Sequence, residues 1–281
     1  MSRKQVVMEE DPLLFYDKQQ QPIGHVLRNL WGKGSAAFLV CGGPSLNKLP
    51  LEKLQEKGIC TLGLNNASGL VKTNVFCCSD PPGKFHHGIW FDPSIMKLVP
   101  TPKLKGRIRI KNPDGSFTPG PRVRDCPNVF GFKRICEYYS DKFLTEDGAT
   151  WGNNNAGVAV TKGPKILFTF FIALRLMHYL GVRRVYMLGV DFQMKPGGRE
   201  VGNYAFPQAG AGNGNNNHYV IATELLSRTK PHLEEMGFQL FNCNPDSRLL
   251  LFPYVPFDIA LEDCRGKVPK ESFDLGGWYE K

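Results

Sequence analysis

The chain has 281 residues, of which 42% are hydrophobic, and a formal net charge of +9 at pH 7. This length accommodates one large domain, or a domain with a substantial excursion, and excludes a lone small module. The positive charge indicates an anionic partner such as a nucleotide, a nucleic acid or an acidic membrane surface, although many enzymes are mildly basic without one.

Eight cysteines are present, and several of them, among them Cys41 and Cys60, lie in or beside apolar runs that are typical of strands. Such cysteines indicate free thiols in a reduced interior, and the spacing of a structural zinc site is absent from the sequence. The first residues lack the apolar core of a signal peptide, and no apolar stretch approaches about 20 residues. We therefore expect a soluble, cytoplasmic protein that does not insert into a membrane.

The change in composition along the chain predicts three parts. Residues 1–35 are polar and glutamine-rich and are expected to form an extension. Residues 36–264 are expected to form a single α/β nucleotide-binding domain, and residues 265–281 a tail.

In the first half of this domain, three apolar runs stop abruptly at small or polar residues, as buried parallel strands do at the rim of an α/β sheet. They lie at 38–41, 60–64 and 74–79, with a short helix expected at 49–57. The first run ends in Gly42-Gly43-Pro44-Ser45, a turn whose glycines permit close backbone approach to a ligand. The pattern describes half of a doubly wound sheet.

Residues 97–134 differ in composition from the preceding strands: Pro and Gly recur, and Lys and Arg strongly outnumber Asp. A short alternating strand is predicted at 107–111. This basic excursion is either a solvated edge hairpin protected by its charges or a surface that contacts a polyanion. The candidate nucleic-acid or acceptor-binding residues are Lys103, Lys105, Arg107, Arg109, Arg122 and Arg124.

In the second half, the apolar segment 166–180 predicts a buried helix, and the strand predicted at 185–189 stops at Asp191. The Gly- and Asn-rich residues 193–218 form a long excursion, which we interpret as a functional lid. A helix at 221–236 and a last strand at 239–242 are expected to follow.

Two motifs can be judged on chemistry alone. The turn at Gly42–Ser45 is neither a Gly-x-Gly-x-x-Gly fingerprint nor a Walker loop. A strand, a Gly-rich turn and a helix together suit a phosphate, although an ordinary tight turn explains the motif as well when it stands alone.

His218 is predicted in the loop before a helix, where an imidazole could take the proton of an acceptor hydroxyl. Such general-base catalysis raises a reaction rate by roughly 10²- to 10⁴-fold.

Taken together, the motifs resemble those of the sialyltransferase-like superfamily. The resemblance rests on the order and spacing of Val40-Cys-Gly-Gly-Pro-Ser-Leu46, Leu180-Gly-Val-Arg-Arg-Val-Tyr-Met-Leu-Gly-Val-Asp-Phe192, Asn203-Tyr-Ala-Phe206, Asn217-His-Tyr219 and Asn242-Cys-Asn-Pro-Asp-Ser-Arg-Leu249. This superfamily comprises compact bacterial lipooligosaccharide sialyltransferases and related phage-borne, flagellin-modification and hydroxymethylpterin pyrophosphokinase-like proteins.

The resemblance implies a Rossmann-like, mostly parallel doubly wound sheet with a lid, in the glycosyltransferase-A-like variant. It implies a CMP- or UDP-linked sugar donor held at the sheet rim, with His218, Tyr204 and Asp191 as the catalytic residues and His218 as the general base. The implied nucleotide-binding residues are Gly42, Gly43, Ser45, Asn65, Asn66, Asp80, Gly189, Asp191, Gln193 and Ser247.

The sequence departs from the sialyltransferase pattern at Gly42, Gln193 and Asp80. No metal is implied by the resemblance, but Asp80 replaces an asparagine of those enzymes and leaves room for a metal-bound nucleotide. Asp191 has an alternative role, since it could cap the turn that follows it.

We expect an inverting glycosyltransferase that acts on an acceptor hydroxyl, with hydroxymethylated pyrimidines of phage DNA as the acceptor. Three alternatives remain open at this point. They are a sialyltransferase acting on a glycan, an ATP- and magnesium-dependent pyrophosphokinase of the same superfamily, and a non-catalytic nucleic-acid-binding protein.

Overall fold

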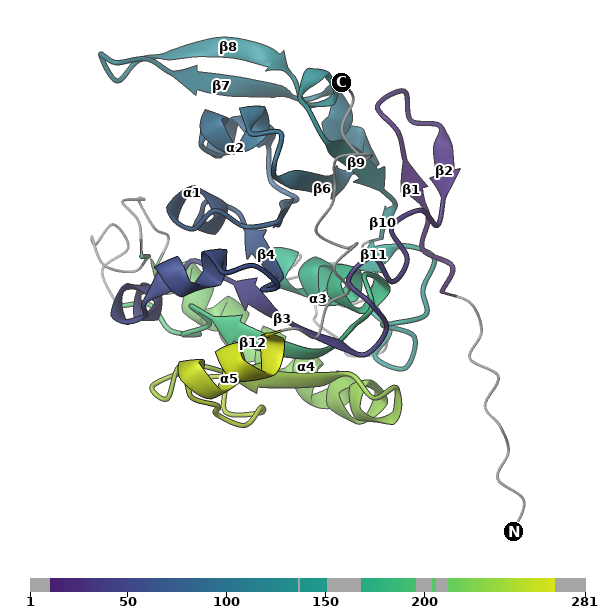
Figure 1. Ribbon diagram of the computed structural model, residues 1–281, viewed down its shortest axis with the longest axis vertical. Helices are drawn as coiled ribbons and strands as arrows, with labels where there is room; N and C mark the ends of the chain where they lie inside the picture. The colour runs from purple at the N-terminus through teal and green to yellow at the C-terminus, as the bar shows by residue number, and fades with distance from the viewer. Residues whose placement is uncertain (1–10, 136, 151–167, 196–203, 206–211, 266–281) are drawn as a thin grey trace.

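A nine-stranded sheet forms the centre of the computed structural model, which describes residues 11–135, 137–150, 168–195, 204–205 and 212–265 (Figure 1). In spatial order the strands are β13 (Gln239–Asn242), β12 (Val182–Leu188), β3 (Ser35–Val40), β4 (Thr61–Leu64), β5 (Val75–Cys77), β6 (Met96–Pro100), β9 (Val129–Phe132), β1 (Phe15–Tyr16) and β2 (Pro22–Gly24). All neighbours from β13 to β9 are parallel, and only β1 and β2 are antiparallel. The mostly parallel, Rossmann-like α/β fold expected from the sequence is therefore confirmed.

The chain builds this sheet in two directions. From β3 it adds β4, β5, β6 and β9 on one side, and it later returns to place β12 and β13 on the other side of β3. The strand order thus reverses between β3 and β12. In open α/β sheets, the crevice outside the carboxyl ends of the strands at such a switch point is the usual place for a ligand.

Helices cover both faces of the sheet. The helices are α1 (Ala67–Leu70), α2 (His87–Phe91), α3 (Thr169–Tyr179), α4 (Gly212–Glu235) and α5 (Phe257–Cys264). Helices α3 and α4 share a buried cluster with Ala37 and Leu39 of β3, whereas α1 and α5 share one with Phe38 and Val40. Strand β3 is therefore buried on both faces, which explains its continuous apolar run.

The start of the chain belongs to the central sheet and its core, whereas the sequence predicts a separate extension. Residues 11–35, expected as an extension, contribute β1 and β2 to the sheet, and Leu13, Phe15 and Trp31 are buried in its core. These strands have only two and three residues, too short to leave a periodic pattern. Residues 1–10 and most of the predicted tail, 266–281, lie outside the described residues.

Short helices also differ from expectation. The helix expected at 49–57 is a 3₁₀ helix at Leu51–Gln55, preceded by another at Pro44–Lys48. Further 3₁₀ helices span Pro82–Lys84, Thr101–Lys105 and Val123–Asp125.

Helix α4 begins at Gly212, earlier than the predicted start at residue 221, and continues through Pro231. His218 therefore lies on a helix and not in the loop before one.

The basic segment 97–134 is partly inside the sheet. Its ends are the central strands β6 and β9, and the hairpin of β7 (Arg107–Lys111) and β8 (Phe117–Arg122) projects beyond them (Figure 1). Lys97 is buried in β6, where its ammonium donates hydrogen bonds to the carbonyl oxygens of Asp92 and Pro127 at 2.5 and 2.9 Å. The basic surface is therefore confined to the hairpin and its flanks.

Strands β10 (Arg134–Ile135) and β11 (Ala149–Thr150) form a separate parallel pair. The seven cysteines in the described part of the chain are free thiols. Within the described ranges, no helix is long and apolar enough to cross a membrane.

Candidate functional site

A cavity of about 420 Å³ opens at the switch point of the sheet. Its walls come from the ends of β3, β4, β5 and β12, the start of α3 and the first turns of α4. It brings together nine of the residues predicted from the sequence, namely Gly42, Gly43, Asn65, Asp80, Gly189, Asp191, Gln193, Tyr204 and His218. The chain segments that the motifs singled out therefore meet in one place.

The turns after β3 and β12 lie against each other. The backbone N–H of Gly43 donates to the carbonyl oxygen of Gly189 at 2.9 Å, and that of Cys41 donates to Leu188 at 2.8 Å. A Cβ atom on Gly43 would lie 2.5 Å from Oδ2 of Asp191, far closer than packing allows. Gly43 thus admits the neighbouring loop of the protein.

A substitution at Gly189 tests how much the close packing of the turns after β3 and β12 constrains stability. It has a φ of +65°, and a Cβ there would meet the carbonyl oxygen of Cys41 well inside van der Waals contact. Gly237 has a φ of +66° but nothing within 4 Å of the corresponding position. We expect Gly237→Ala to cost about 1 kcal/mol of unfolding free energy, from its φ alone, and Gly189→Ala at least about 2 kcal/mol. Equal losses in urea unfolding would contradict the steric argument.

Asp191 fixes the geometry of the cavity. Its side chain is buried; Oδ2 accepts a hydrogen bond from the Ser45 N–H at 3.0 Å, and Oδ1 accepts one from the Asn244 side-chain amide at 2.5 Å. The carboxylate therefore ties the turn after β3 to the loop after β13. This is a capping role, although the capped turn is the one at Gly43–Ser45 and not the one that follows Asp191.

Three residues predicted to bind nucleotide do not line the cavity. Ser45 donates its backbone N–H to Asp191, as described above. Ser247 donates its hydroxyl to the carbonyl oxygen of Val190 at 2.6 Å, and Asn66 accepts from the N–H of His86 at 3.2 Å. These contacts support the loops around the cavity.

Asn65 and Asp80 present oxygen atoms at the ends of β4 and β5. Asn65 has a φ of +54°, and its side-chain carbonyl oxygen is buried with no hydrogen-bond partner in the described structure. Buried polar atoms are rarely left unpaired, so this oxygen is available to a ligand. Asp80 is about half exposed and accepts from the ammonium of Lys84 at 3.2 Å.

An aromatic wall faces these polar groups. Phe192 stacks on Tyr219 with ring centroids 4.8 Å apart, and Phe168 lies 6.2 Å from Tyr219. Burial raises the pKa of the Tyr219 hydroxyl. Phe192 has a φ of +52°, a conformation that bulky residues rarely adopt and that tends to occur at functional sites.

Sequence reasoning assigned no role to these rings. Phe192 and Tyr219 follow directly after the candidate site residues Asp191 and His218 in the motifs. This adjacency in the sequence is the signal that could have identified them as cavity residues. Phe168 precedes α3 in an apolar run, where nothing in the pattern distinguishes a cavity wall from a core residue.

His218 lies in the second turn of α4, and its half-buried ring meets Phe168 edge-on at 6.1 Å. No hydrogen bond to the His218 ring is present within the described structure. The ring therefore borders the cavity in a position from which it can reach a bound molecule.

Several hydrogen bonds hold the described parts of the lid. The backbone N–H of Ala205 donates to the carbonyl oxygen of Gly42 at 2.9 Å, which places Tyr204 at the cavity. Burial raises the pKa of Tyr204, which forms a side-chain hydrogen bond with Asn215. Asn216 pins the start of the lid because its side chain bonds both the N–H and the carbonyl of Met194, at 2.8 and 2.9 Å. Lid residues 196–203 and 206–211 lie outside the described residues.

The acidic residues of the cavity are Asp80 and Asp191. In the described ranges, no group of three or more His, Cys, Asp or Glu side chains is arranged to hold a metal ion.

No model of a known protein family and no curated protein matches this chain. Among solved structures, it is similar to the MAf glycosyltransferase from Magnetospirillum magneticum AMB-1, with 14% identity, a TM-score of 0.45 and coverage of 88% of this chain. The match spans only 39% of that glycosyltransferase. The chain is also similar to the sialyltransferase CstII from Campylobacter jejuni in complex with cytidine-5'-monophosphate, with 11% identity, a TM-score of 0.41 and coverage of 80% of this chain and 86% of that one.

Proposed function

We propose that this protein is a nucleotide-sugar-dependent glycosyltransferase whose donor binds in the switch-point cavity. The observation that carries the proposal is the meeting of His218, the Gly42–Gly43 turn and the aromatic wall in one cavity at the carboxyl edge of a parallel sheet. Its volume of about 420 Å³ lies within the range of small-molecule sites, about 300 to 1,000 Å³.

In this proposal, the nucleotide is CMP- or UDP-linked, lies against the Gly42–Gly43 turn and donates a hydrogen bond to the unpaired oxygen of Asn65. The aromatic wall contacts its base or sugar. Asp191 acts as a positioning residue, because both of its carboxylate oxygens are already engaged with Ser45 and Asn244. Tyr204 closes the site from the lid.

The transfer step follows from this arrangement. His218 takes the proton of the acceptor hydroxyl while the hydroxyl oxygen bonds to the anomeric carbon of the sugar. The bond from that carbon to the phosphate oxygen breaks, and the nucleotide leaves with the electron pair. A single displacement of this kind inverts the anomeric centre, and the general base contributes roughly 10²- to 10⁴-fold.

For the acceptor, we propose a hydroxymethylated pyrimidine in DNA. Residues of α1, the start of α2 and the β7–β8 hairpin line a groove of about 600 Å³, and Lys84, Arg109, Lys111 and Phe117 are among them. The Arg109 guanidinium lies 4.3 Å above the Phe117 ring. Cations beside an exposed aromatic ring suit phosphates and unstacked bases. Asn66 lines this groove and its neighbour Asn65 lines the cavity, so a flipped base could pass from one to the other.

The proposal is tested by incubating the protein with CMP- and UDP-linked sugars and with hydroxymethylated DNA, unmodified DNA or a lipooligosaccharide. The DNA is digested to nucleosides for mass spectrometry. A sugar-sized mass increase on hydroxymethylated DNA alone is expected. Modification of the lipooligosaccharide instead would replace DNA by a glycan acceptor, and diphosphate transfer from ATP with magnesium would favour the pyrophosphokinase.

The hairpin cations give a separate prediction for the DNA acceptor. Neutralising DNA phosphates makes binding fall with salt, at a log–log slope of roughly −0.9 per neutralised phosphate on duplex DNA. Removing the exposed charges with Arg109→Gln and Lys111→Gln should make the slope shallower by up to about 0.9 for each phosphate that is no longer neutralised. Lys57→Gln, an exposed lysine outside the hairpin, should leave it unchanged. Equal slopes in all variants, measured by fluorescence anisotropy, would exclude the hairpin as the DNA surface.

A further inference from the structure

Aromatic rings from two elements line the groove of about 600 Å³ beside the β7–β8 hairpin. Phe117 of β8 is 49% exposed, although the Arg109 guanidinium lies over one face of its ring. His86 and His87, at the start of α2, stack on each other with ring centroids 4.7 Å apart. The groove therefore offers ring surface to a ligand in addition to positive charge.

Contacts between α2, the hairpin and the preceding turn hold these groups in place. Nδ1 of His87 accepts a hydrogen bond from the backbone N–H of Lys111 at 3.3 Å, which joins α2 to β7. Lys111 is paired with Phe117 across the hairpin. The stem of Arg109 packs against Gly83, where a Cβ atom would lie 2.8 Å from Cγ of the arginine. The rings and the guanidinium are therefore positioned by the fold itself.

The charge of the groove is positive. No acidic residue is among the described residues that line it. Lys84 is paired with Asp80 at 3.2 Å, so its charge is already offset. Arg109 and Lys111 are exposed and form no ion pair within the described structure. Their charges suit the phosphates of a polyanion.

The two imidazoles add neutral donors. Nδ1 of His86 accepts from the N–H of Gly88 at 3.2 Å, and Nδ1 of His87 accepts from Lys111, so each neutral ring carries its proton on Nε2. Burial, together with the neighbouring His87 and Lys111, lowers the pKa of His86. The histidine pair can therefore offer a ring face and N–H donors without adding charge at pH 7.

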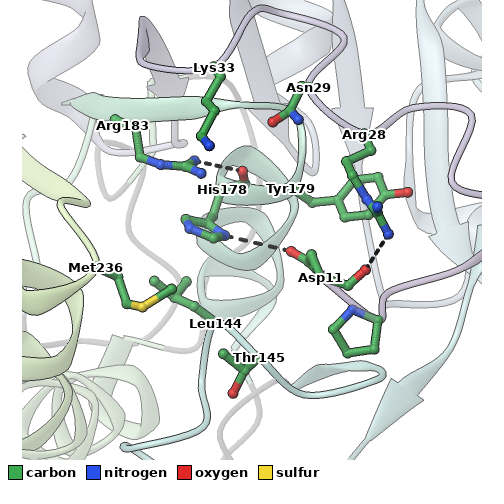
Figure 2. A pocket seen from close by; sticks show the side chains of 11 residues that line it. Asp11, Arg28, Asn29, Lys33, Leu144, Thr145, His178, Tyr179, Arg183 and Met236 are labelled. Atoms are coloured by element: carbon green, nitrogen blue, oxygen red, sulfur yellow. Dashed lines mark hydrogen bonds and ion pairs between the residues drawn. The ribbon is translucent and has the colours of Figure 1, made fainter. Parts of the chain in front are cut away.

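Another cavity lined by cations lacks such ring surface. It has a volume of about 470 Å³ and lies at the amino-terminal end of β12, where Lys33 and Arg183 approach from the same side (Figure 2). Its rings belong to Tyr179 and His178, which are only 1% and 5% exposed, and the carboxylate of Asp11 also lines it. Charge alone therefore does not distinguish the hairpin groove, whereas exposed rings do.

We propose that the hairpin groove binds DNA as a single strand, which rests on the proposed function and names the form of its acceptor. In a duplex the bases already stack on one another, so the exposed rings would meet only backbone. Unstacked bases can lie on Phe117 and the histidine pair, while Arg109 and Lys111 neutralise phosphates. A hydroxymethylated pyrimidine in a single strand could then reach the neighbouring switch-point cavity without the cost of opening a duplex.

The test is fluorescence anisotropy of the whole protein without a sugar donor, at one salt concentration. The probes are a labelled oligothymidylate, the same strand in a duplex, and an abasic strand of equal length and charge. The single strand should bind at least about fivefold more tightly than either of the others, as expected when at least one base stacks on a ring.

Phe117→Ala should weaken binding of oligothymidylate at least about fivefold, but that of the abasic strand less than about twofold, because the latter has no base to stack. Phe117→Tyr keeps the ring and should bind like wild type. The matched control is Tyr139→Ala, since Tyr139 is 40% exposed under the ammonium of Lys142 and does not line the groove. This variant and Lys33→Gln should also bind like wild type.

The assignment is overturned if the duplex or the abasic strand binds as tightly as the single strand, or if Phe117→Ala and Tyr139→Ala lose equal affinity. Sugar transfer to hydroxymethylated DNA in a duplex but not in a single strand would also overturn it, while leaving the proposed glycosyltransferase intact. Conversely, the expected binding without any sugar transfer to the strand would remove the DNA acceptor and support the groove assignment.

Discussion

His218→Ala is expected to lower the rate of sugar transfer by about two orders of magnitude or more, because it removes the proposed general base. Donor affinity should change less than about threefold, since the ring meets the cavity wall at Phe168 and forms no hydrogen bond within the described structure. Transfer is measured as nucleotide released from the donor, and affinity by calorimetric titration.

His232→Ala is the matched control, because this histidine is half-buried on the same helix but does not line the cavity. It should transfer sugar at the wild-type rate. Near-wild-type turnover of His218→Ala, or an equal loss in both variants, would remove His218 from the mechanism.

Arg175→Ala is expected to lower the free energy of unfolding by about 3 to 5 kcal/mol, the cost of leaving one charge of a buried pair uncompensated. Arg175 is fully buried, and its partner Asp11 is only 14% exposed on its side chain. Urea denaturation measures the loss. The double variant Arg175→Met with Asp11→Leu, which removes both charges, should recover a large part of it.

Arg228→Ala serves as the surface control. Its ion pair with Glu224 is about half exposed at both ends, and its loss should cost less than about 1 kcal/mol. A loss for Arg175→Ala as small as that for Arg228→Ala would show that the Asp11–Arg175 pair does not anchor residues 11–35 to α3.

The same pair predicts an acid dependence. Burial alone would raise the pKa of Asp11, but contacts with His178 and Arg175 outweigh it and hold the pKa well below its usual range. A lowered carboxyl pKa contributes stability above the unfolded-state value of about 4, and this stability is lost as the pH falls below it. Between pH 6 and pH 3, wild-type stability should therefore fall more steeply than that of Arg175→Ala, as followed by urea denaturation.

Much of the sheet could be predicted from the sequence because its strands are buried on both faces. The runs at β3 and at residues 185–188 of β12 are apolar segments that end at Gly42 and Gly189, and such endings mark the rim of a parallel sheet. The residues at these ends accordingly meet in one cavity.

Other features leave no local signal. Strand β1 pairs with β9, which is distant in the chain, and the short strand β2 pairs only with β1. The early start of α4 at Gly212 lies in a Gly- and Asn-rich stretch whose helix propensity is poor, so that the composition indicates a loop. Tertiary contacts override propensity there, as when Asn216 binds the backbone of Met194.

The sequence also does not show what the polar residues at the rim of the sheet bind. Asp191 and Ser247 end or follow strands, as ligand-binding residues do, but their side chains bond to the protein itself. A sequence pattern places a polar residue at the rim of a sheet; only the packing of the loops decides whether it faces the cavity or holds a turn.

Diffraction from crystals soaked with CMP and with UDP at millimolar concentration shows whether the donor nucleotide binds in the switch-point cavity. We expect nucleotide density bounded by Gly42–Gly43, Asn65 and His218, with the base or ribose against the aromatic wall. Absence of density in this cavity with either nucleotide would exclude it as the donor site.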